Sequence, residues 1–187
     1  MYILKLINIK LHLDPRQYGF RKASSTSHAF CVYEEARRQL DKEGKKGFVI
    51  FLDFSKAFDK VTRSKLMVSL IGDLGALEWY ALVRYYEVGK VKVFIHKLNM
   101  DLEEFATIVG VKQGGPFSPT AFNKYINKLI IRLIDSGELV VIRRVKGGCI
   151  VYADDTTVVT DSAEKMHRII VLFAVFYYAF FLGRKNA

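Results

Sequence analysis

The sequence predicts one globular domain that combines α-helices with β-strands. The chain has 187 residues, of which 51% are hydrophobic, and this is enough to bury a core of ordinary size. Stretches with a helical spacing of apolar residues lie beside short runs rich in β-branched and aromatic residues. No internal repeat or low-complexity linker is present, and three prolines offer few places to divide the chain. We therefore treat it as a single unit.

Composition narrows the class of partner. The formal net charge of +10, from 29 Lys and Arg against 19 Asp and Glu, favours a polyanion, because each neutralised phosphate releases counterions. Cys31 and Cys149 are far apart, which argues against a disulfide framework and predicts reduced thiols in an intracellular protein. The four histidines are equally scattered, so no zinc site is predicted.

The two ends predict neither a signal peptide nor a membrane anchor. Residues 1–13 alternate apolar and polar side chains and offer no small-residue cleavage site. Ile169–Gly183 carries no charge over 15 residues, but a membrane-spanning helix needs roughly 20. We expect this stretch to form a buried or partly buried helix, and its apolar character predicts an exposed hydrophobic patch.

A helix and a strand lead to the first carboxylate of interest. From Ser25 to Leu40, apolar residues recur on one helical face, and the preceding Ser-Thr run offers N-caps. Phe48–Leu52 (FVIFL) predicts a strand buried on both faces, with Asp53 at its end. This carboxylate, followed by FSKAFDKV turning into a helix, would lie at the mouth of a sheet, where ligands tend to bind.

A second pair of carboxylates lies in a predicted hairpin. Cys149–Thr160 (CIVYADDTTVVT) has two β-branched and aromatic runs around a tight centre, and we expect Asp154 and Asp155 at its tip. Adjacent like charges repel, so a divalent cation such as Mg²⁺ is their natural partner. If Asp53 faces this tip, three carboxylates would form a two-metal site about 4 Å wide, which implies phosphoryl transfer.

The third segment is a loop that leads into a helix. Gly110–Asn123 (GVKQGGPFSPTAFN) has glycines that permit close backbone approach to a ligand, and a helical pattern continues through Ile134. Each of the three segments also has an ordinary explanation when taken alone: a strand end, a loop before a helix, or a solvated turn.

In this order, FLDFSKAFDKV, GVKQGGPFSPTAFN and VYADD resemble the first, second and third palm motifs of reverse transcriptases, particularly those of non-LTR retrotransposons and group II introns. Upstream, QYGFRK resembles the fingers motif of these enzymes. The similarity covers Gln17 to Ser162, which is 146 of 187 residues. One departure is the Gly-Gly-Pro-Phe run at 114–117, where many members have Gly-Ser or Gly-Cys followed by Leu.

The resemblance implies an α+β fold: a palm with a small, mostly antiparallel sheet packed on helices, plus partial fingers. It divides the single partial domain 1–187 into partial fingers (17–47), palm (48–168) and a truncated end of the palm (169–187). We expect the thumb to be absent and the chain to be part of a longer polyprotein. By family, it would act in the nucleus or in a cytoplasmic ribonucleoprotein.

The resemblance also assigns roles at the site. Asp53, Asp154 and Asp155 match the carboxylates that bind two Mg²⁺ ions, with Mn²⁺ as a substitute. These ions would promote attack of a DNA primer 3′-hydroxyl on a dNTP, copied from an RNA template. Phe58 matches the aromatic residue that excludes a 2′-hydroxyl, with core packing as its alternative. The backbone at Phe54 would contact phosphates.

The remaining matches place a glutamine and two cations near the nucleotide and a tyrosine near the primer end: Gln113, Arg21, Lys22 and Tyr152. Candidate contacts to template-primer phosphates, each with a solvated surface as its alternative, are Arg37, Arg38, Lys45, Lys46, Arg143, Arg144 and Lys146.

Two other functions stay open. One is a catalytically inactive remnant that at most binds nucleic acid through its basic surface. The other is a viral RNA-dependent RNA polymerase, although such enzymes usually have Gly-Asp-Asp where this chain has Ala153-Asp154-Asp155.

Overall fold

The computed structural model describes residues 7, 11–87, 90–91, 94–95, 100–101, 105–142 and 145–182. The α-helices are α2 (Thr26–Lys42), α3 (Arg63–Leu70), α4 (Ala76–Glu87), α5 (Ser118–Asp135) and α6 (Ala163–Tyr177). A 3₁₀ turn forms at Phe58–Lys60, and α6 continues as a π-helical turn at Tyr178–Leu182.

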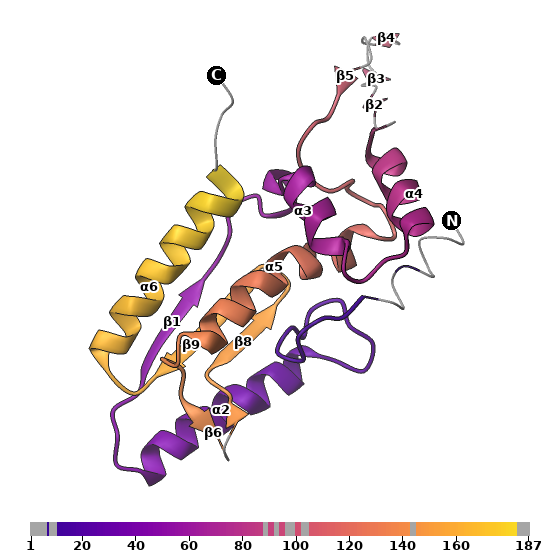
Figure 1. Cartoon of the computed structure of the whole chain (residues 1–187). Coiled ribbons are helices and arrows are strands. Elements are labelled where there is room, and N and C mark those ends of the chain that lie inside the picture. The colour runs from indigo at the N-terminus through magenta and orange to yellow at the C-terminus, as the bar shows by residue number, and fades with distance from the viewer. Residues whose placement is uncertain are drawn as a thin grey trace.

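A three-stranded antiparallel sheet forms the centre of the fold (Figure 1). Its strands are β1 (Phe48–Leu52), β8 (Cys149–Tyr152) and β9 (Asp155–Thr160), in the order β1-β9-β8. The other ladders pair two strands each: β2 (Lys90–Val91) with β5 (Phe105–Ala106), β3 (Phe94–Ile95) with β4 (Met100–Asp101), and β6 (Val141–Ile142) with β7 (Val145–Lys146).

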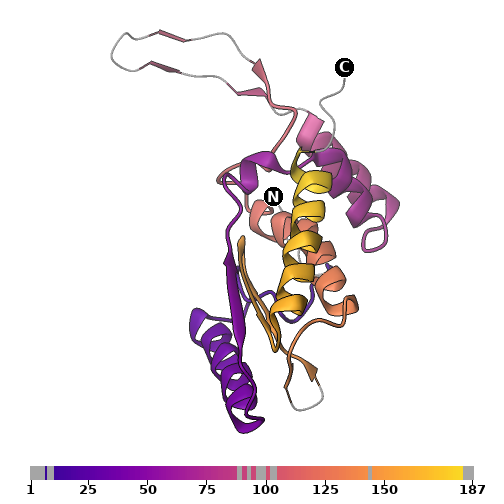
Figure 2. The same cartoon turned by 90° about the vertical axis from the view of Figure 1, so that its left-hand side faces the viewer.

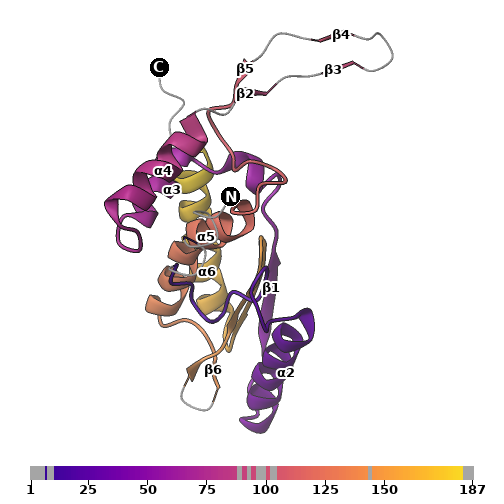
Figure 3. The same ribbon diagram turned by 90° about the vertical axis from the view of Figure 1, so that its right-hand side faces the viewer.

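The sheet lies between two layers of helices. Figures 2 and 3 show α5 and α6 on one side of it and α2 on the other. Helix α6 contacts β1 and β9, α5 contacts β8, and α2 contacts β8 from the opposite side. This arrangement confirms the α+β palm that the resemblance implies.

The helices predicted for α2 and α5 are confirmed. Helix α2 begins one residue after its N-cap, Ser25, whose side chain accepts a hydrogen bond from the backbone N–H of His28 (3.3 Å). Helix α5 carries Pro119 in its first turn, where a missing N–H costs nothing. The segment after Asp53 differs from the prediction, because a 3₁₀ turn precedes the next α-helix, which begins at Arg63.

The prediction that β1 is buried on both faces is wrong. The side chains of Val49 and Phe51 are 39% and 74% exposed, while those of Phe48, Ile50 and Leu52 pack against the core. An antiparallel sheet can leave one face open to solvent, and here the α5–α6 layer covers only the other face of β1.

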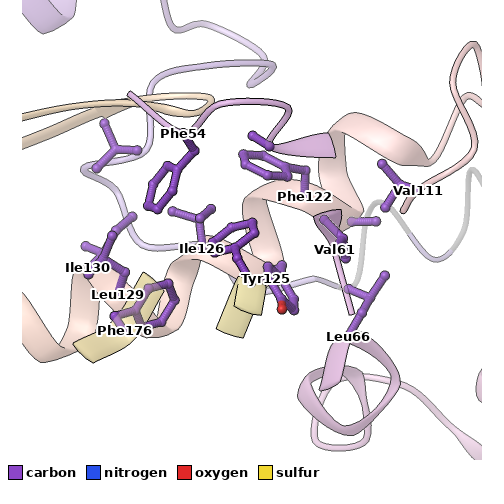
Figure 4. Close-up of a cluster of buried hydrophobic side chains, with 14 of the residues drawn as sticks. Phe54, Val61, Leu66, Val111, Phe122, Tyr125, Ile126, Leu129, Ile130 and Phe176 are labelled. Carbon is purple, nitrogen blue, oxygen red and sulfur yellow. The ribbon is translucent and has the colours of Figure 1, made fainter. Parts of the chain in front are cut away.

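The core lies between the sheet and α5, α6 and α3. Figure 4 shows side chains of α3, α5 and α6 converging there with Phe54, which follows β1, and the rings of Phe122, Tyr125 and Phe176 are among them. Each of these three is at most 1% exposed. Burial of large aromatic side chains dominates the stability of such a core.

Helix α6 also confirms the prediction for the apolar stretch near the end of the chain. Its inner face is buried, and its outer face exposes a hydrophobic patch that includes Ile170, Val171, Val175 and, in the following turn, Tyr178. Across the part of the chain that the structure describes, no helix is long and apolar enough to span a bilayer.

Candidate active site

The strand register brings together the segments that carry the three aspartates. Leu52 pairs with Thr156, so Asp53, the residue after β1, and Asp155, the first residue of β9, lie at the same end of the sheet. Asp154 belongs to the turn that joins β8 to β9. Residues two apart along a strand share a face, so Asp53 extends the open face of β1.

The hairpin turn is one residue earlier than predicted. Tyr152 pairs with Asp155, which is the first residue of β9, so the two turn residues are Ala153 and Asp154. The turn is formed by a positive φ of 60° at Ala153. Asp154 is therefore at the tip, whereas Asp155 is held by the strand.

The carboxylates influence one another electrostatically. Partial burial raises the pKa of Asp154 above its ordinary value, and repulsion from the carboxylates of Asp155 and Asp53 adds to this rise. A cation among the three would relieve this repulsion.

The donor chemistry suits a hard divalent cation, since all three side chains offer carboxylate oxygens. Their arrangement is open: among the side chains that the structure describes, no three acidic, histidine or cysteine groups form a ready metal-binding cluster. Asp53 and Asp155 are exposed, so both have the freedom to turn toward an ion. The residues therefore fit a metal ion, because all three are carboxylates and all three lie at the same end of the sheet.

The two phenylalanines after Asp53 lie in different surroundings. Phe54 is 1% exposed, and its ring stacks on Phe173 with 4.7 Å between centroids. Only its backbone is left for the predicted phosphate contact. Phe58 is half-buried and stacks on Phe122 at 4.3 Å, while Phe20 meets it edge-on at 6.2 Å.

The residues predicted to bind the nucleotide make contacts of their own. The exposed Gln113 donates a hydrogen bond from Nε2 to the carboxylate of Asp59 (2.7 Å). Arg21 is folded back, with Nη1 donating to the backbone oxygens of Asp14 (2.7 Å) and Gln17 (3.1 Å). Lys22 is exposed.

A pocket of about 300 Å³ opens between α2 and the open face of the sheet, beside Asp155. Tyr152, predicted to lie near the primer end, lines it together with Phe51. Phe30 and Tyr33 of α2 line the other side, and the sequence analysis missed them. Phe30 is 61% exposed, whereas Tyr33 is half-buried. An exposed aromatic ring such as that of Phe30 is suited to stacking on a base.

The basic residues differ in how much charge they present. Arg37 pairs with Asp41 (2.7 Å) and Glu34 (3.2 Å), and Lys45 pairs with Glu43 (2.8 Å). By contrast, the structure shows Arg38 and Lys46 simply as exposed residues, and Arg143 and Arg144 lie outside the described residues. For Lys146 only the backbone is described, in β7.

An antiparallel sheet that carries a carboxylate pair at a hairpin and a third carboxylate just after the neighbouring strand, backed by two helices, defines a polymerase palm. A family model described as "Reverse transcriptase (RNA-dependent DNA polymerase)" matches residues 1–182. The chain therefore belongs to the reverse transcriptase family.

Two curated relatives are retrotransposon polyproteins. The chain is 30% identical over 129 residues to the Retrovirus-related Pol polyprotein from type-2 retrotransposable element R2DM of Drosophila melanogaster, covering 66% of this chain and 12% of that protein. It is 29% identical over 159 residues to the Pol polyprotein from type-1 retrotransposable element R2 of Nasonia vitripennis, covering 81% and 15%. The predicted likeness to non-LTR retrotransposons is confirmed, and the chain spans a small part of these relatives.

Solved telomerases share the fold. Apo telomerase from Candida tropicalis matches with a TM-score of 0.69 at 12% identity, over 95% of this chain and 33% of that one. Telomerase from Candida albicans in complex with a TWJ fragment of telomeric RNA matches with a TM-score of 0.67 at 12% identity, over 94% and 32%. At this identity the likeness concerns the fold alone.

Proposed function

We propose that this chain is the catalytic core of a retrotransposon reverse transcriptase, which joins a dNTP to a primer 3′-hydroxyl on an RNA template. The single observation that carries the proposal is the pairing of Leu52 with Thr156, which brings Asp53, just after β1, to the same end of the sheet as Asp155 and the turn that holds Asp154. We also propose that the rest of a longer polyprotein is its partner, since the curated relatives are Pol polyproteins.

Asp53, Asp154 and Asp155 would hold two Mg²⁺ ions at the end of the sheet. Ions bound there supply the chemistry that activates the primer hydroxyl and neutralises the triphosphate and the leaving pyrophosphate. The chain provides the rest. The pairing of β1 with β9 brings Asp53, which follows β1, to the end of the sheet where Asp155 lies, and the aromatic pocket beside Asp155 offers a surface on which the primer end can stack.

The test is primer extension on an RNA template with dNTPs and Mg²⁺. We expect the double variant Asp154→Asn, Asp155→Asn to lose activity by at least roughly 100-fold, because even groups that only support a metal ligand contribute 10–100-fold. Asp135→Asn is the matched control, because it makes the same chemical change at an exposed residue at the end of α5.

The alternative is an inactive remnant that at most binds nucleic acid. The absence of a ready metal cluster among the described side chains is the observation in its favour. A folded parent chain that binds the template-primer but fails to extend it with Mg²⁺ or with Mn²⁺ would support the inactive remnant and overturn the proposed activity.

A further inference from the structure

Gln17 is a polar side chain, 0% exposed, beside the turn that carries Asp154. Its amide engages both backbone polar groups of Ala153: Nε2 donates to the carbonyl oxygen (3.1 Å), and Oε1 accepts from the N–H (2.9 Å). Ala153 is 6% exposed and lies just beyond the last strand pair, Tyr152 with Asp155. Removal of the amide would therefore deprive a buried backbone of two hydrogen bonds, which is costly.

The conformation of Ala153 makes this support necessary. Its φ of 60° is in the left-handed region, which is unfavourable for a residue with a Cβ. A non-glycine residue persists in this region only where its surroundings hold it there. The two hydrogen bonds from Gln17 fix the orientation of the peptide units on both sides of Ala153, and the second of these units leads directly to Asp154.

Gln17 is itself fixed, because its segment runs beside β8. Gln17 forms a parallel bridge with Val151. The backbone N–H of Tyr18 donates to the oxygen of Val151 (2.7 Å), and the N–H of Val151 donates to the oxygen of Arg16 (3.0 Å). The beginning of the QYGFRK motif thus extends the edge of the catalytic sheet.

Gly19 closes the contact with the turn. A Cβ at this position would lie 2.3 Å from the backbone nitrogen of Ala153, so only glycine allows this approach. The N–H of Gly19 also donates to Oε1 of Gln17 (2.9 Å), and the buried Asn123 of α5 donates to the oxygen of Gly19 (2.7 Å). The turn, the motif and α5 therefore form one hydrogen-bonded unit.

We propose that Gln17 is a positioning residue, which holds the turn at Ala153 so that the carboxylate of Asp154 is presented to the same metal ions as Asp53 and Asp155. The proposal rests on the proposed polymerase function. It extends the site to a residue that touches neither substrate nor metal, and it gives the first residue of the QYGFRK motif a role distinct from the nucleotide contacts predicted for Arg21 and Lys22.

Two variants of the full chain separate positioning from general stability. Gln17→Met keeps a side chain of similar length but removes both hydrogen bonds to Ala153. Asn127→Leu is the matched control. Asn127 is a buried amide of α5 whose Oδ1 accepts from the backbone N–H of Asp14 (2.7 Å), so it holds the same segment without touching the turn.

Three measurements are made on the parent chain and on both variants: primer extension, Mn²⁺ binding by electron paramagnetic resonance, and hydrogen exchange of the Ala153 amide. For Gln17→Met we expect kcat to fall by about 100-fold with little change in the KM for dNTP, because misplacement of a catalytic group costs about this much. Mn²⁺ affinity should fall by about tenfold, and the Ala153 amide should lose its protection. Asn127→Leu should leave all three close to the parent.

If both variants lost activity, Mn²⁺ affinity and amide protection to the extent that their unfolding temperatures fell, Gln17 would have a merely structural role and the proposal would be overturned. Unchanged Mn²⁺ affinity in Gln17→Met would overturn it as well. Mn²⁺ binding and amide exchange can both be measured without polymerisation. If the parent chain fails to extend primers, the proposed function fails, while Mn²⁺ binding and amide exchange still decide the role of Gln17.

Discussion

Phe58 has two explanations at the scale of a single residue. Its stacking on Phe122 and its edge contact with Phe20 would justify an aromatic side chain without any nucleotide. The family resemblance instead makes it the group that excludes a 2′-hydroxyl. Its half-buried state is compatible with both, because a partly exposed side chain can pack against the protein and still be reached by a nucleotide.

Substitution of Phe58 separates these explanations. We expect Phe58→Val to raise the ratio of ribonucleotide to deoxynucleotide incorporation by at least about tenfold, since a smaller side chain leaves room for the extra hydroxyl. Single-nucleotide primer extension measures this ratio. Phe122→Leu is the control, because it removes the stacking partner and leaves the Phe58 side chain in place. An unchanged ratio in Phe58→Val, or an equal rise in both variants, would contradict the predicted role.

At the scale of elements, the sequence predicts what local patterns determine. The cap at Ser25 and the apolar face of α2 lie within one short segment of the sequence. The apolar run from Phe48 to Leu52 and the proline near the start of α5 are likewise each a local signal. Each of these signals acts over a few residues, so no knowledge of the rest of the fold is needed. The order of the three motifs along the chain then predicts the palm fold through the family resemblance.

The features that the sequence analysis missed depend on contacts between distant segments. Burial of Phe51 is decided by whether a helix covers its face of the sheet, and the run FVIFL is the same in either case. The hairpin turn lies one residue earlier than predicted because Tyr152 pairs with Asp155 across it. Gln17 meets Ala153 across 136 positions of sequence, so no local pattern could reveal its role.

Helix α6 gives a prediction at the element scale. Its N-cap, Ser162, accepts a hydrogen bond at Oγ from the backbone N–H of Lys165 (3.2 Å). We expect Ser162→Ala to lower the free energy of unfolding by about 1 kcal/mol, while Ser162→Asp, which also caps, should stay close to the parent. Urea denaturation measures both. Equal stability of the alanine variant and the parent would mean that the packing of α6 on β1 and β9 alone determines its start.

At the scale of the whole molecule, the excess of positive charge is only partly available to a polyanion. Part of it is neutralised locally: Arg37 and Lys45 have carboxylate partners in or beside α2, and Arg168 of α6 binds Glu138 through two hydrogen bonds of 2.7 and 2.9 Å. The exposed Arg38 and Lys46 are therefore better candidates for phosphate contacts than their paired neighbours.

Binding of an RNA–DNA template-primer should therefore weaken as the salt concentration rises, and the exposed cations Arg38 and Lys46 should contribute to this salt dependence. We expect the affinity to fall by at least about tenfold between about 50 and 200 mM salt, which corresponds to roughly two neutralised phosphates at a slope of about −0.9 each. Fluorescence anisotropy over this range gives the slope of log K against log salt.

Arg38→Gln with Lys46→Gln should make that slope shallower by about one to two units, because each lost phosphate contact removes about 0.9. Arg37→Gln is the matched control on the same helix, since the Arg37 charge is already compensated by Asp41 and Glu34. If Arg37→Gln reduced the slope as much as the double variant does, long-range net charge would govern binding, and the position of each cation would not. A slope near zero in the parent would remove the basic surface from the binding site altogether.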